Sequence, residues 1–391
     1  MIGRRVAVTG LGMLASCGTG KEAFWAGLLA TPADGERRIT DFDPADWFGP
    51  KEARRTDRFA QLAVAAAALA LDDAGPLSVD LDRAGVLIAT GVGGLHTLEE
   101  QIVLRHEKGQ RRVSPFLVPM MMANAGAASV SMRFGWRGPC ETTVTACAAS
   151  THAITNAARL IATGTCDAVM AGGSEAAITP TGVAGFTNMT ALSNSGRSRP
   201  YDAERDGFVI AEGAAVLVLE AWDVATARGA HIYGEVLGGA STADAHHITA
   251  PSPDGSGAVR AIEQALADAG LTPGDIRHIN GHGTSTPLND ASEAKAISKV
   301  FGSPGPPVTS TKGVTGHALG AAGALEAAAV LLSMQHRLIP PTAGLEHLDP
   351  DITIDVVSGE PRPWEPGPSL SNSFGFGGHN GCLVLGPAEA G

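Results

Sequence analysis

Three residues of this 391-residue sequence could carry acyl-transfer chemistry: Cys147, His282 and His317. A cysteine with a histidine beside it is an activated nucleophile, and such a pair transfers acyl groups through a covalent intermediate. Two histidines can also donate N–H groups to one oxygen atom, which is what an enolate formed by decarboxylation requires. Lys312 stands five residues before His317. The residue types therefore point to acyl transfer coupled to decarboxylation.

The segment around Cys147 predicts a strand, a sharp turn and a helix. Residues 140–146 are rich in Thr and Val, and residues 148–163 are rich in Ala, with Gly164 as a plausible C-cap. A second apolar strand follows at residues 167–173. The N–H groups and the dipole at a helix N-terminus would favour a thiolate at Cys147 and could hold an oxyanion. The alternative is a small buried residue without reactivity, as many free cysteines are.

The second half of the chain repeats this arrangement. Residues 276–280 form a short predicted strand that leads to His282, and residues 307–312 form another that leads to Lys312 and His317. Each half thus holds a strand, a reactive residue near a turn and a helix of small residues. This pattern indicates an internal duplication and a layered α/β architecture. No linker-like stretch separates the halves, so we expect one packed unit.

Composition and charge limit the classes of protein that fit. The chain has 44% apolar and 17% charged residues, and its net charge of −12 argues against nonspecific nucleic-acid binding. No apolar run reaches the roughly 18 residues of a membrane span, and the N-terminus lacks the apolar stretch of a signal peptide. The cysteines are odd in number and without a CxxC pair, which favours a cytoplasmic protein with reduced thiols. They are Cys17, Cys140, Cys147, Cys166 and Cys382.

Two patterns superficially suggest a cofactor or a metal. Residues 5–12 read as a strand ending in a glycine turn, but Ala15 takes the place of the third glycine of a dinucleotide loop. No acidic residue ends a clear second strand about twenty residues later, so we expect no dinucleotide cofactor. His246 and His247 are adjacent and lack metal-ligand spacing, so we expect no metal there.

Two further segments could serve a partner or a substrate. Residues 103–112 contain a basic cluster, which is either a solvated loop or a docking patch for an acidic partner. Its members are Arg105, Lys108, Arg111 and Arg112. Residues 120–122 are all methionine, a residue that fills gaps in cores and also lines adaptable apolar channels.

The reactive residues stand in four motifs that closely resemble those of the elongating β-ketoacyl-acyl-carrier-protein synthases. The resemblance follows family order and covers essentially the whole chain. The motifs are Val-Thr-Ala-Cys147-Ala-Ala-Ser, Gly-His282-Gly-Thr-Ser-Thr-Pro, Thr-Lys312-Gly-Val-Thr-Gly-His317 and Asn-Ser-Phe374-Gly-Phe376-Gly-Gly. The resemblance implies the thiolase fold, a five-layered α-β-α-β-α sandwich of two duplicated halves. We expect these halves at residues 1–235, with the nucleophile, and residues 236–391, with the two histidines.

The resemblance also implies the reaction. Cys147 would take an acyl chain from the phosphopantetheine arm of an acyl carrier protein, and malonyl carrier would then enter and lose CO₂. His282 and His317 would stabilise the resulting enolate, which attacks the acyl group. Backbone N–H groups of Cys147 and Phe376 would hold the oxyanion. No bound cofactor is implied. The partners implied are an acidic acyl carrier protein and a second copy of the chain or, alternatively, a chain-length factor.

Supporting roles follow from the same resemblance. Lys312 would orient the site together with Glu326, or the two would form a purely structural ion pair. Phe374 would support the site or serve only as core packing. Phe376 would also gate the entry of malonyl. The pantetheine amides would be bound by Thr284 and Thr286, and the acyl tunnel would be lined by Met120, Met121 and Met122.

This chain departs from the family pattern at two positions. Gly281 stands where many members carry alanine, and His379 stands where many carry threonine. Neither change removes a catalytic group, but His379 adds a titratable ring beside the Phe376 turn.

Related enzymes and other pathways remain as alternatives. Thiolases place a second cysteine in the turn near Phe374, and Cys382 falls several residues too late for that role. Initiating synthases carry one histidine and an asparagine, whereas this chain has His317 as well. The main rival is a type II polyketide ketosynthase, with a chain-length partner. A non-catalytic partner subunit would lack Cys147, whose Thr-Ala-Cys-Ala setting favours the fatty-acid type.

Overall fold

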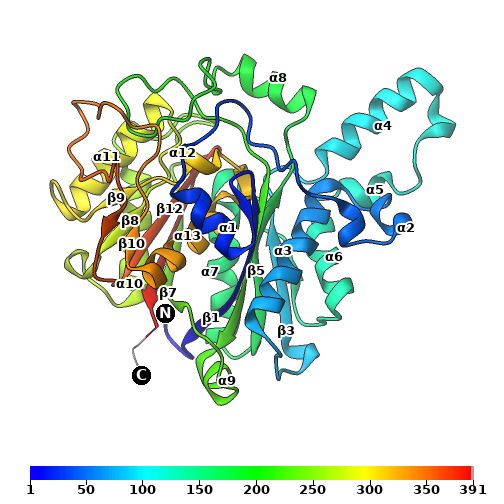
Figure 1. Ribbon diagram of the computed structural model, residues 1–391, viewed down its shortest axis with the longest axis horizontal. Coiled ribbons are helices and arrows are strands. Elements are labelled where there is room, and N and C mark those ends of the chain that lie inside the picture. The colour runs from blue at the N-terminus through cyan, green and yellow to red at the C-terminus, as the bar shows by residue number, and fades with distance from the viewer. Residues whose placement is uncertain (389–391) are drawn as a thin grey trace.

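The computed structural model describes residues 1–388, and its strands run through the centre of the molecule (Figure 1). The strands are β1 (Val6–Ala15), β2 (Gly18–Thr19), β3 (Ala84–Ala89), β4 (Cys140–Glu141), β5 (Ala168–Glu175), β6 (Gly213–Ala221), β7 (Gly234–Ala243), β8 (His278–Asn280), β9 (Val308–Thr309), β10 (Leu338–Ile339), β11 (Arg362–Pro363), β12 (Ser369–Gly375) and β13 (His379–Pro387).

Helices cover the strands on both faces. They are α1 (Lys21–Leu28), α2 (Pro50–Ala53), α3 (Arg58–Ala74), α4 (Leu95–Lys108), α5 (Leu117–Met121), α6 (Ala125–Phe134), α7 (Ala149–Ala162), α8 (Pro180–Asn188), α9 (Trp222–Ala227), α10 (Ser256–Ala269), α11 (Pro287–Phe301), α12 (Lys312–Thr315) and α13 (Ala322–His336). Within residues 1–388, none of these helices combines the length and the apolar composition that a membrane crossing needs.

The order of the strands reveals the duplication that the sequence predicts. In the first half the order is β4-β3-β5-β6-β1, with β4, β3 and β5 parallel and the remaining pairs antiparallel. In the second half the order β9-β8-β12-β13-β7 has the same directions. A short antiparallel contact between β1 and β7 joins the two sheets. Cys147 lies between β4 and α7, and His317 lies between β9 and α13, so the two residues occupy equivalent places.

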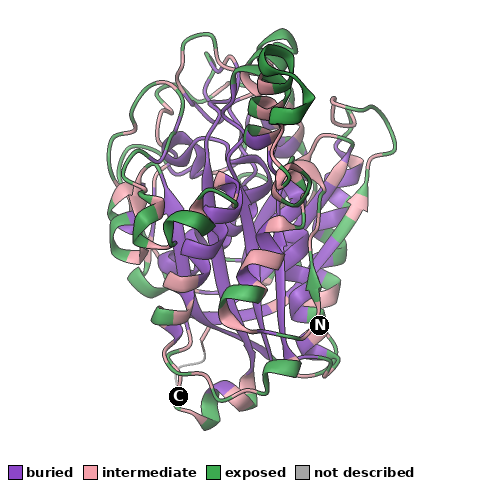
Figure 2. Cartoon of the chain, turned by 90° about the vertical axis from the view of Figure 1, so that its right-hand side faces the viewer, coloured by how far each residue is buried: buried purple, intermediate pink, exposed green. Residues whose placement is uncertain are grey.

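The two central helices, α7 and α13, form the middle layer. Each contacts strands of both halves, and the two helices also contact each other. Figure 2 shows this interior as the buried part of the chain, with the exposed residues on the outer helices and loops. Residues 322–334 of α13 are all buried, as expected of a helix that is apolar on every side. Helices α3 and α6 cover the outer face of the first half, and α10 and α11 cover that of the second.

Several local predictions need correction. Strand β1 does not end at the glycines but continues to Ala15. Gly12 instead allows close packing, because a Cβ there would lie 2.0 Å from the carbonyl oxygen of Ala66 on α3. Only Cys140 and Glu141 of the predicted strand before the nucleophile pair with a neighbour. The basic segment is not a loop, since it lies at the C-terminal end of α4 and in the 3₁₀ turn at residues 110–112.

We predict that Gly323→Ala destabilises the fold by about 1–2 kcal/mol, because overpacking a close interface costs more than the helix gains. A Cβ at Gly323 would lie 2.1 Å from Oγ1 of Thr151, at the contact between α13 and α7. The matched control is Gly185→Ala in α8, where no atom lies within 4 Å of the added Cβ and stability should hold or rise. Chemical denaturation of both variants measures the difference. Equal stability of the two would contradict close packing of the central helices.

Candidate active site

Cys147 lies in a strained turn rather than in the first turn of a helix. The 3₁₀ turn η4 (Ala146–Ala148) precedes α7, and Ala146 has a φ of 50°. A left-handed conformation costs a non-glycine residue roughly 1–2 kcal/mol, so the surrounding packing must hold it in place. The Cys147 side chain is 6% exposed, and it faces a pocket rather than the protein core.

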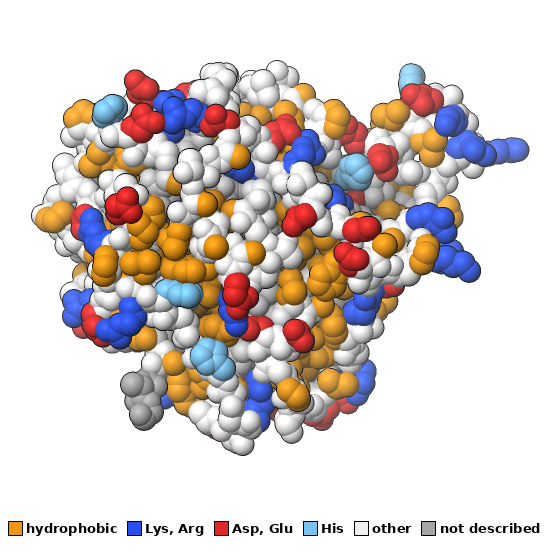
Figure 3. Space-filling view, viewed as in Figure 1, with side chains coloured by type: hydrophobic (Ala, Val, Ile, Leu, Met, Phe, Trp, Pro, Cys, Tyr) orange, Lys and Arg blue, Asp and Glu red, His pale blue; other side chains and the backbone are white. Residues whose placement is uncertain are grey.

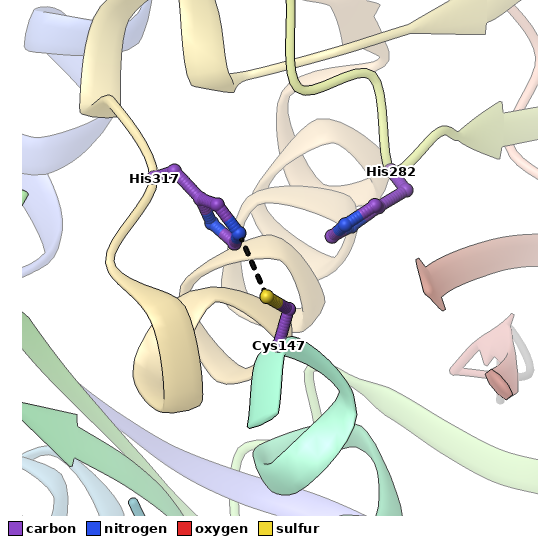
Figure 4. Close-up of side chains that lie close together, drawn as sticks. All are labelled: Cys147, His282 and His317. Carbon is purple, nitrogen blue, oxygen red and sulfur yellow. Dashed lines mark hydrogen bonds between the residues drawn. The ribbon is translucent and has the colours of Figure 1, made fainter. Parts of the chain in front are cut away.

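The two histidines approach this sulfur from the second half of the chain. His317 Nε2 lies 3.0 Å from Cys147 Sγ, and the centroids of the two imidazole rings are 5.4 Å apart. Both rings are directed toward the sulfur (Figure 4). His282 follows β8, and His317 follows α12 and is held by a backbone bond of 2.7 Å to Val209. The structure thus brings together three residues that lie up to 170 positions apart in the sequence.

The resting state of the nucleophile differs from the prediction. Burial raises the pKa of Cys147 to about 11, and this outweighs the lowering by Lys312 and by the N–H groups of Phe376 and Cys147. The expected resting thiolate is therefore wrong, because the helix end cannot offset the loss of solvent around the sulfur. The group is a neutral thiol near pH 7, and it needs a base when it reacts.

Both histidines are neutral as well. Burial, together with the nearby charge of Lys312, holds the pKa of His282 and of His317 well below the ordinary value. A neutral imidazole can accept the thiol proton at one nitrogen, and it can also donate an N–H bond. The site therefore combines a neutral thiol with two neutral rings.

Lys312 selects the tautomer of one of these rings. Its ammonium pairs with Glu326 in the interior, donates to the His282 carbonyl oxygen at 2.7 Å and lies 3.3 Å from His282 Nδ1. A nitrogen that accepts from Lys312 carries no proton, so the proton of His282 resides on Nε2. In contrast, His317 Nδ1 has no partner among the described residues, and neither tautomer of that ring is fixed.

The glycine-rich turn at residues 375–378 closes the other side of the site. Phe374, at the end of β12, packs edge-on against His282 with centroids 5.9 Å apart. The N–H groups of Phe376 and Cys147 both act on the sulfur. A Cβ at Gly375 would lie 3.0 Å from Cys147 N, so a glycine is needed where the turn crosses the nucleophile.

A cavity of about 360 Å³ connects this centre with the surface. Thr284 and Thr286 line it, and their hydroxyls lie 2.9 Å apart. The methionines at residues 120–122 do not line it within one chain, and Met122 is 44% exposed on the surface. Their assignment to the acyl tunnel stays a prediction.

Sequence reasoning missed several residues of the pocket. Phe208 packs edge-on against His317, and the loop at residues 249–251 and residues 189–191 form other parts of the wall. It also missed Glu293, whose carboxylate accepts from His282 N at 2.7 Å and from Gly283 N at 2.8 Å. These residues lie in loops or on α11, outside the four motifs. For Glu293, the only signal in the sequence was an acidic residue on the helix that follows the His282 loop.

The three reactive side chains also form a set that could hold a metal ion. The sulfur and one nitrogen from each of His282 and His317 lie within 4.8 Å of one another. The ammonium of Lys312, however, lies within hydrogen-bonding distance of His282 and would repel a cation. The charge distribution therefore suits a developing anion at this place better than a metal ion.

We predict that alkylation of Cys147 by iodoacetamide accelerates about tenfold per pH unit between pH 7 and pH 10, because only the thiolate reacts and its pKa is near 11. Since Cys140 is exposed, the measurement uses the Cys140→Ser variant and peptide mass analysis. Cys147→Ala in the same background is the control. A rate that levels off below pH 8 would mean that the sulfur rests as a thiolate beside an imidazolium.

Comparison with known proteins gives the family of this chain. Residues 33–225 match the family model of the β-ketoacyl synthase N-terminal domain, and residues 233–346 match that of the C-terminal domain. In an alignment of 408 positions, the chain is 45% identical to 3-oxoacyl-(acyl-carrier-protein) synthase 2 of Synechocystis sp. The alignment covers 98% of each protein.

Solved structures agree with this match. The ishigamide ketosynthase/chain length factor superposes with a TM-score of 0.92 and 34% identity, covering 99% of this chain and 100% of that one. A type II polyketide ketosynthase in complex with its acyl-carrier protein, AntDE:AntF bound to the hexaketide, superposes with a TM-score of 0.90 and 31% identity, covering 99% and 100%. The predictions of a thiolase-type fold and of an acyltransferase are confirmed. The chain belongs to the β-ketoacyl synthase family.

Proposed function

We propose that this protein is a 3-oxoacyl-acyl-carrier-protein synthase that elongates an acyl chain held on Cys147 by decarboxylative condensation with malonyl carrier. The observation that carries the proposal is the 3.0 Å contact between Cys147 Sγ and His317 Nε2, with His282 on the same cavity. This group has one nucleophile and two rings able to donate to an oxygen. Thr284 and Thr286 would bind the pantetheine arm in the cavity that leads to it.

The first half-reaction loads the enzyme. Cys147 Sγ attacks the carbonyl carbon of the acyl thioester while His317 Nε2 takes the thiol proton. The N–H groups of Cys147 and Phe376 hold the oxyanion. When the oxyanion collapses, the carbon–sulfur bond to pantetheine breaks, and the leaving thiolate receives the proton from His317. The unpartnered Nδ1 of His317 suits this role, because the ring can exchange protons without losing a protein contact.

The second half-reaction makes the new carbon–carbon bond. Malonyl carrier loses CO₂, and the two electrons of the broken bond form an enolate at the thioester oxygen. His282 Nε2–H and His317 N–H donate to this oxygen, and Lys312 keeps the proton of His282 on the correct nitrogen. The enolate carbon attacks the acyl carbonyl, Cys147 leaves as a thiolate, and it takes up one proton. Phe376 would admit malonyl at this stage.

The pathway is proposed to be fatty-acid elongation. The chain is 45% identical to the Synechocystis synthase and 31–34% identical to the two ketosynthase structures. A type II polyketide pathway is the second candidate, because both of those structures align along almost the whole chain. Incubation with a series of acyl carriers and malonyl carrier, followed by mass analysis, separates them. One added two-carbon unit per cycle on saturated acyl carriers supports the first candidate, and poly-β-keto products support the second.

We predict that His282→Ala and His317→Ala each slow malonyl decarboxylation by roughly 10²–10³, since each removes one donor to the enolate oxygen. Acyl transfer to Cys147 should survive in His282→Ala and be reduced in His317→Ala, because only His317 contacts the sulfur. The double variant should lose less than the product of the single losses. CO₂ release and single-turnover acylation measure the two steps, with Cys147→Ala as the control that cannot be acylated. Normal decarboxylation in both single variants would refute the assigned roles.

The exposed end of α4 is the proposed docking site for the acidic acyl carrier protein. Arginine and lysine side chains gather there on a projection from the body of the molecule, at the right of Figure 3. Among residues 1–388, none of the four basic side chains forms an ion pair or a side-chain hydrogen bond that would offset its charge. They are Arg105, Lys108, Arg111 and Arg112. Free charges in an otherwise acidic protein attract an acidic partner and orient it.

We predict that the double variant Arg105→Glu/Lys108→Glu raises KM for malonyl carrier about tenfold while leaving turnover of malonyl-pantetheine unchanged, because only the carrier meets this surface. The matched control is Lys295→Glu/Lys299→Glu, two exposed lysines one helical turn apart on α11. Steady-state kinetics at two salt concentrations measure both variants. An equal effect of the two pairs would mean that only net charge matters.

A second copy of this chain is the proposed partner of the β4 edge. Strand β4 pairs with β3 on one side only, and apolar side chains are exposed around it. They include Val118, Met122, Met132 and Val144, of which Met132 is 77% exposed. An edge strand with apolar neighbours is a surface that a partner covers. Native mass spectrometry of the purified chain distinguishes a homodimer from a monomer that waits for a chain-length factor.

A further inference from the structure

Glu175, at the end of β5, is a buried carboxylate that the proposed mechanism does not use. Its side chain is 0% exposed, and no lysine, arginine or histidine forms an ion pair with it among the described residues. Its carboxylate instead accepts three hydrogen bonds. They come from Thr90 Oγ1 at 3.0 Å, Gly91 N at 2.6 Å and Gly320 N at 3.0 Å. Burying a carboxylate without a cation is costly, so the bonds that it makes must matter to the fold or to the site.

The three donors belong to two segments that flank the nucleophile. Thr90 and Gly91 follow β3, and the Thr90 N–H donates to Thr143 in the segment that leads to Cys147. Gly320 lies in the 3₁₀ turn η6 (Leu319–Ala321), which connects His317 to α13. Glu175 therefore joins a segment that supports the cysteine to the turn that carries the histidine.

The backbone around Glu175 is tight and strained. A Cβ at Gly320 would lie 2.2 Å from Gly91 N, and a Cβ at Gly91 would lie 2.6 Å from Glu175 Oε2. Leu319, which lines the pocket beside Cys147, has a φ of 44°. A left-handed leucine persists only when its surroundings over-determine it. The bond from Gly320 N to the carboxylate is one constraint that fixes this turn.

Glu175 also acts on the nucleophile through its charge. The negative charge raises the pKa of Cys147, whereas Lys312 lowers it. The other titratable groups that face the sulfur are His317 and His282, which are both neutral. Burial raises the pKa of Glu175 itself to about 7, so its charge changes close to neutral pH.

We propose that Glu175 is a positioning residue of the active site, whose carboxylate clamps the β3 end to the Leu319–Gly320 turn and thereby holds His317 Nε2 against the Cys147 thiol. The proposal rests on the proposed role of Cys147 as the acyl acceptor. It adds a residue outside the four motifs, and it explains why a carboxylate stays buried with N–H donors but without a cation.

The charge of Glu175 changes how easily Cys147 ionises, and the direction of this effect follows from the protonation of Glu175. Below about pH 7 the carboxyl group is protonated and no longer opposes ionisation of Cys147, whereas above this value the anion does so. Removing the charge should therefore make the thiol easier to ionise, while removing the clamp should make it harder for His317 to serve the thiol. A neutral replacement separates these effects, because a small alkylating reagent needs only the thiolate and acyl transfer needs the geometry.

The test is Glu175→Met in the Cys140→Ser background. A methionine keeps about the same volume but has neither the charge nor an oxygen to accept from Gly91 N and Gly320 N, which both donate to Glu175 Oε2. We expect alkylation of Cys147 by iodoacetamide at pH 8 to become about threefold faster or more, as for the loss of a nearby like charge. Single-turnover acylation by acyl carrier should become at least about tenfold slower, as for a misplaced reacting group. The matched control is Glu220→Met, which replaces another carboxylate with 0% exposure that pairs with Arg228 away from the pocket.

The rates of alkylation and acylation together distinguish a positioning role of Glu175 from a purely structural one. Opposite changes in alkylation and acylation, absent from Glu220→Met, support the proposal. If both rates match those of the parent protein, or if both variants lose the two rates in parallel with stability, Glu175 is not a positioning residue. Should Glu175→Met fail to fold, Thr90→Val removes only the hydroxyl donor to Glu175 and keeps the carboxylate. It should slow acylation by a smaller factor and leave alkylation close to the parent rate, and unchanged acylation overturns the proposal. An acyl adduct on Cys147→Ala would instead show that the proposed function is wrong.

Discussion

The active site depends on one packing contact, the approach of α7 and α13 in the middle layer. The two helices come from different halves, and each follows the turn that carries a reactive residue. Ala324 N donates to Ser150 Oγ at 2.9 Å, and Gly323 leaves space for Thr151. Because the helices are rich in alanine and glycine, their backbones approach closely, and the preceding turns meet. Larger side chains in this layer would separate the sulfur from the imidazole.

Burial, more than any single charge, sets the chemistry of the centre. A desolvated thiol and two desolvated imidazoles are all neutral, so no ion has to be stabilised before substrate arrives. Lys312, a buried cation beside these groups, is paired with Glu326, and its proposed role is to fix the proton of His282. In the proposed mechanism, new charge develops only during the reaction, on an oxyanion and on an enolate. Preformed N–H donors would then stabilise this charge without reorganisation of solvent.

The backbone strain of the fold is concentrated around the same cavity. Seven non-glycine residues among residues 1–388 have a positive φ, and five of them line the pocket or adjoin a residue that does. These five are Ala146, Thr190, Ala245, Ser285 and Leu319. Each costs roughly 1–3 kcal/mol and needs neighbours that hold it. The buried carboxylates supply part of that restraint, since Asp290 binds the N–H groups of Thr284 and Ser285 at 2.9 and 3.1 Å.

The sequence by itself determined the family, the duplicated α/β architecture and the reactive residues. These follow from local patterns: glycine-flanked histidines, small-residue helices after turns, and motifs in a fixed order. Only the tertiary structure decided the protonation of the site, because the pKa of Cys147 depends on how much water the fold removes and not on its position in a turn. The same holds for Glu175, whose donors lie 84 and 145 positions away in the chain. No spacing rule connects such residues, since their proximity comes from the pairing of β3 with β5 and the packing of η6 against them.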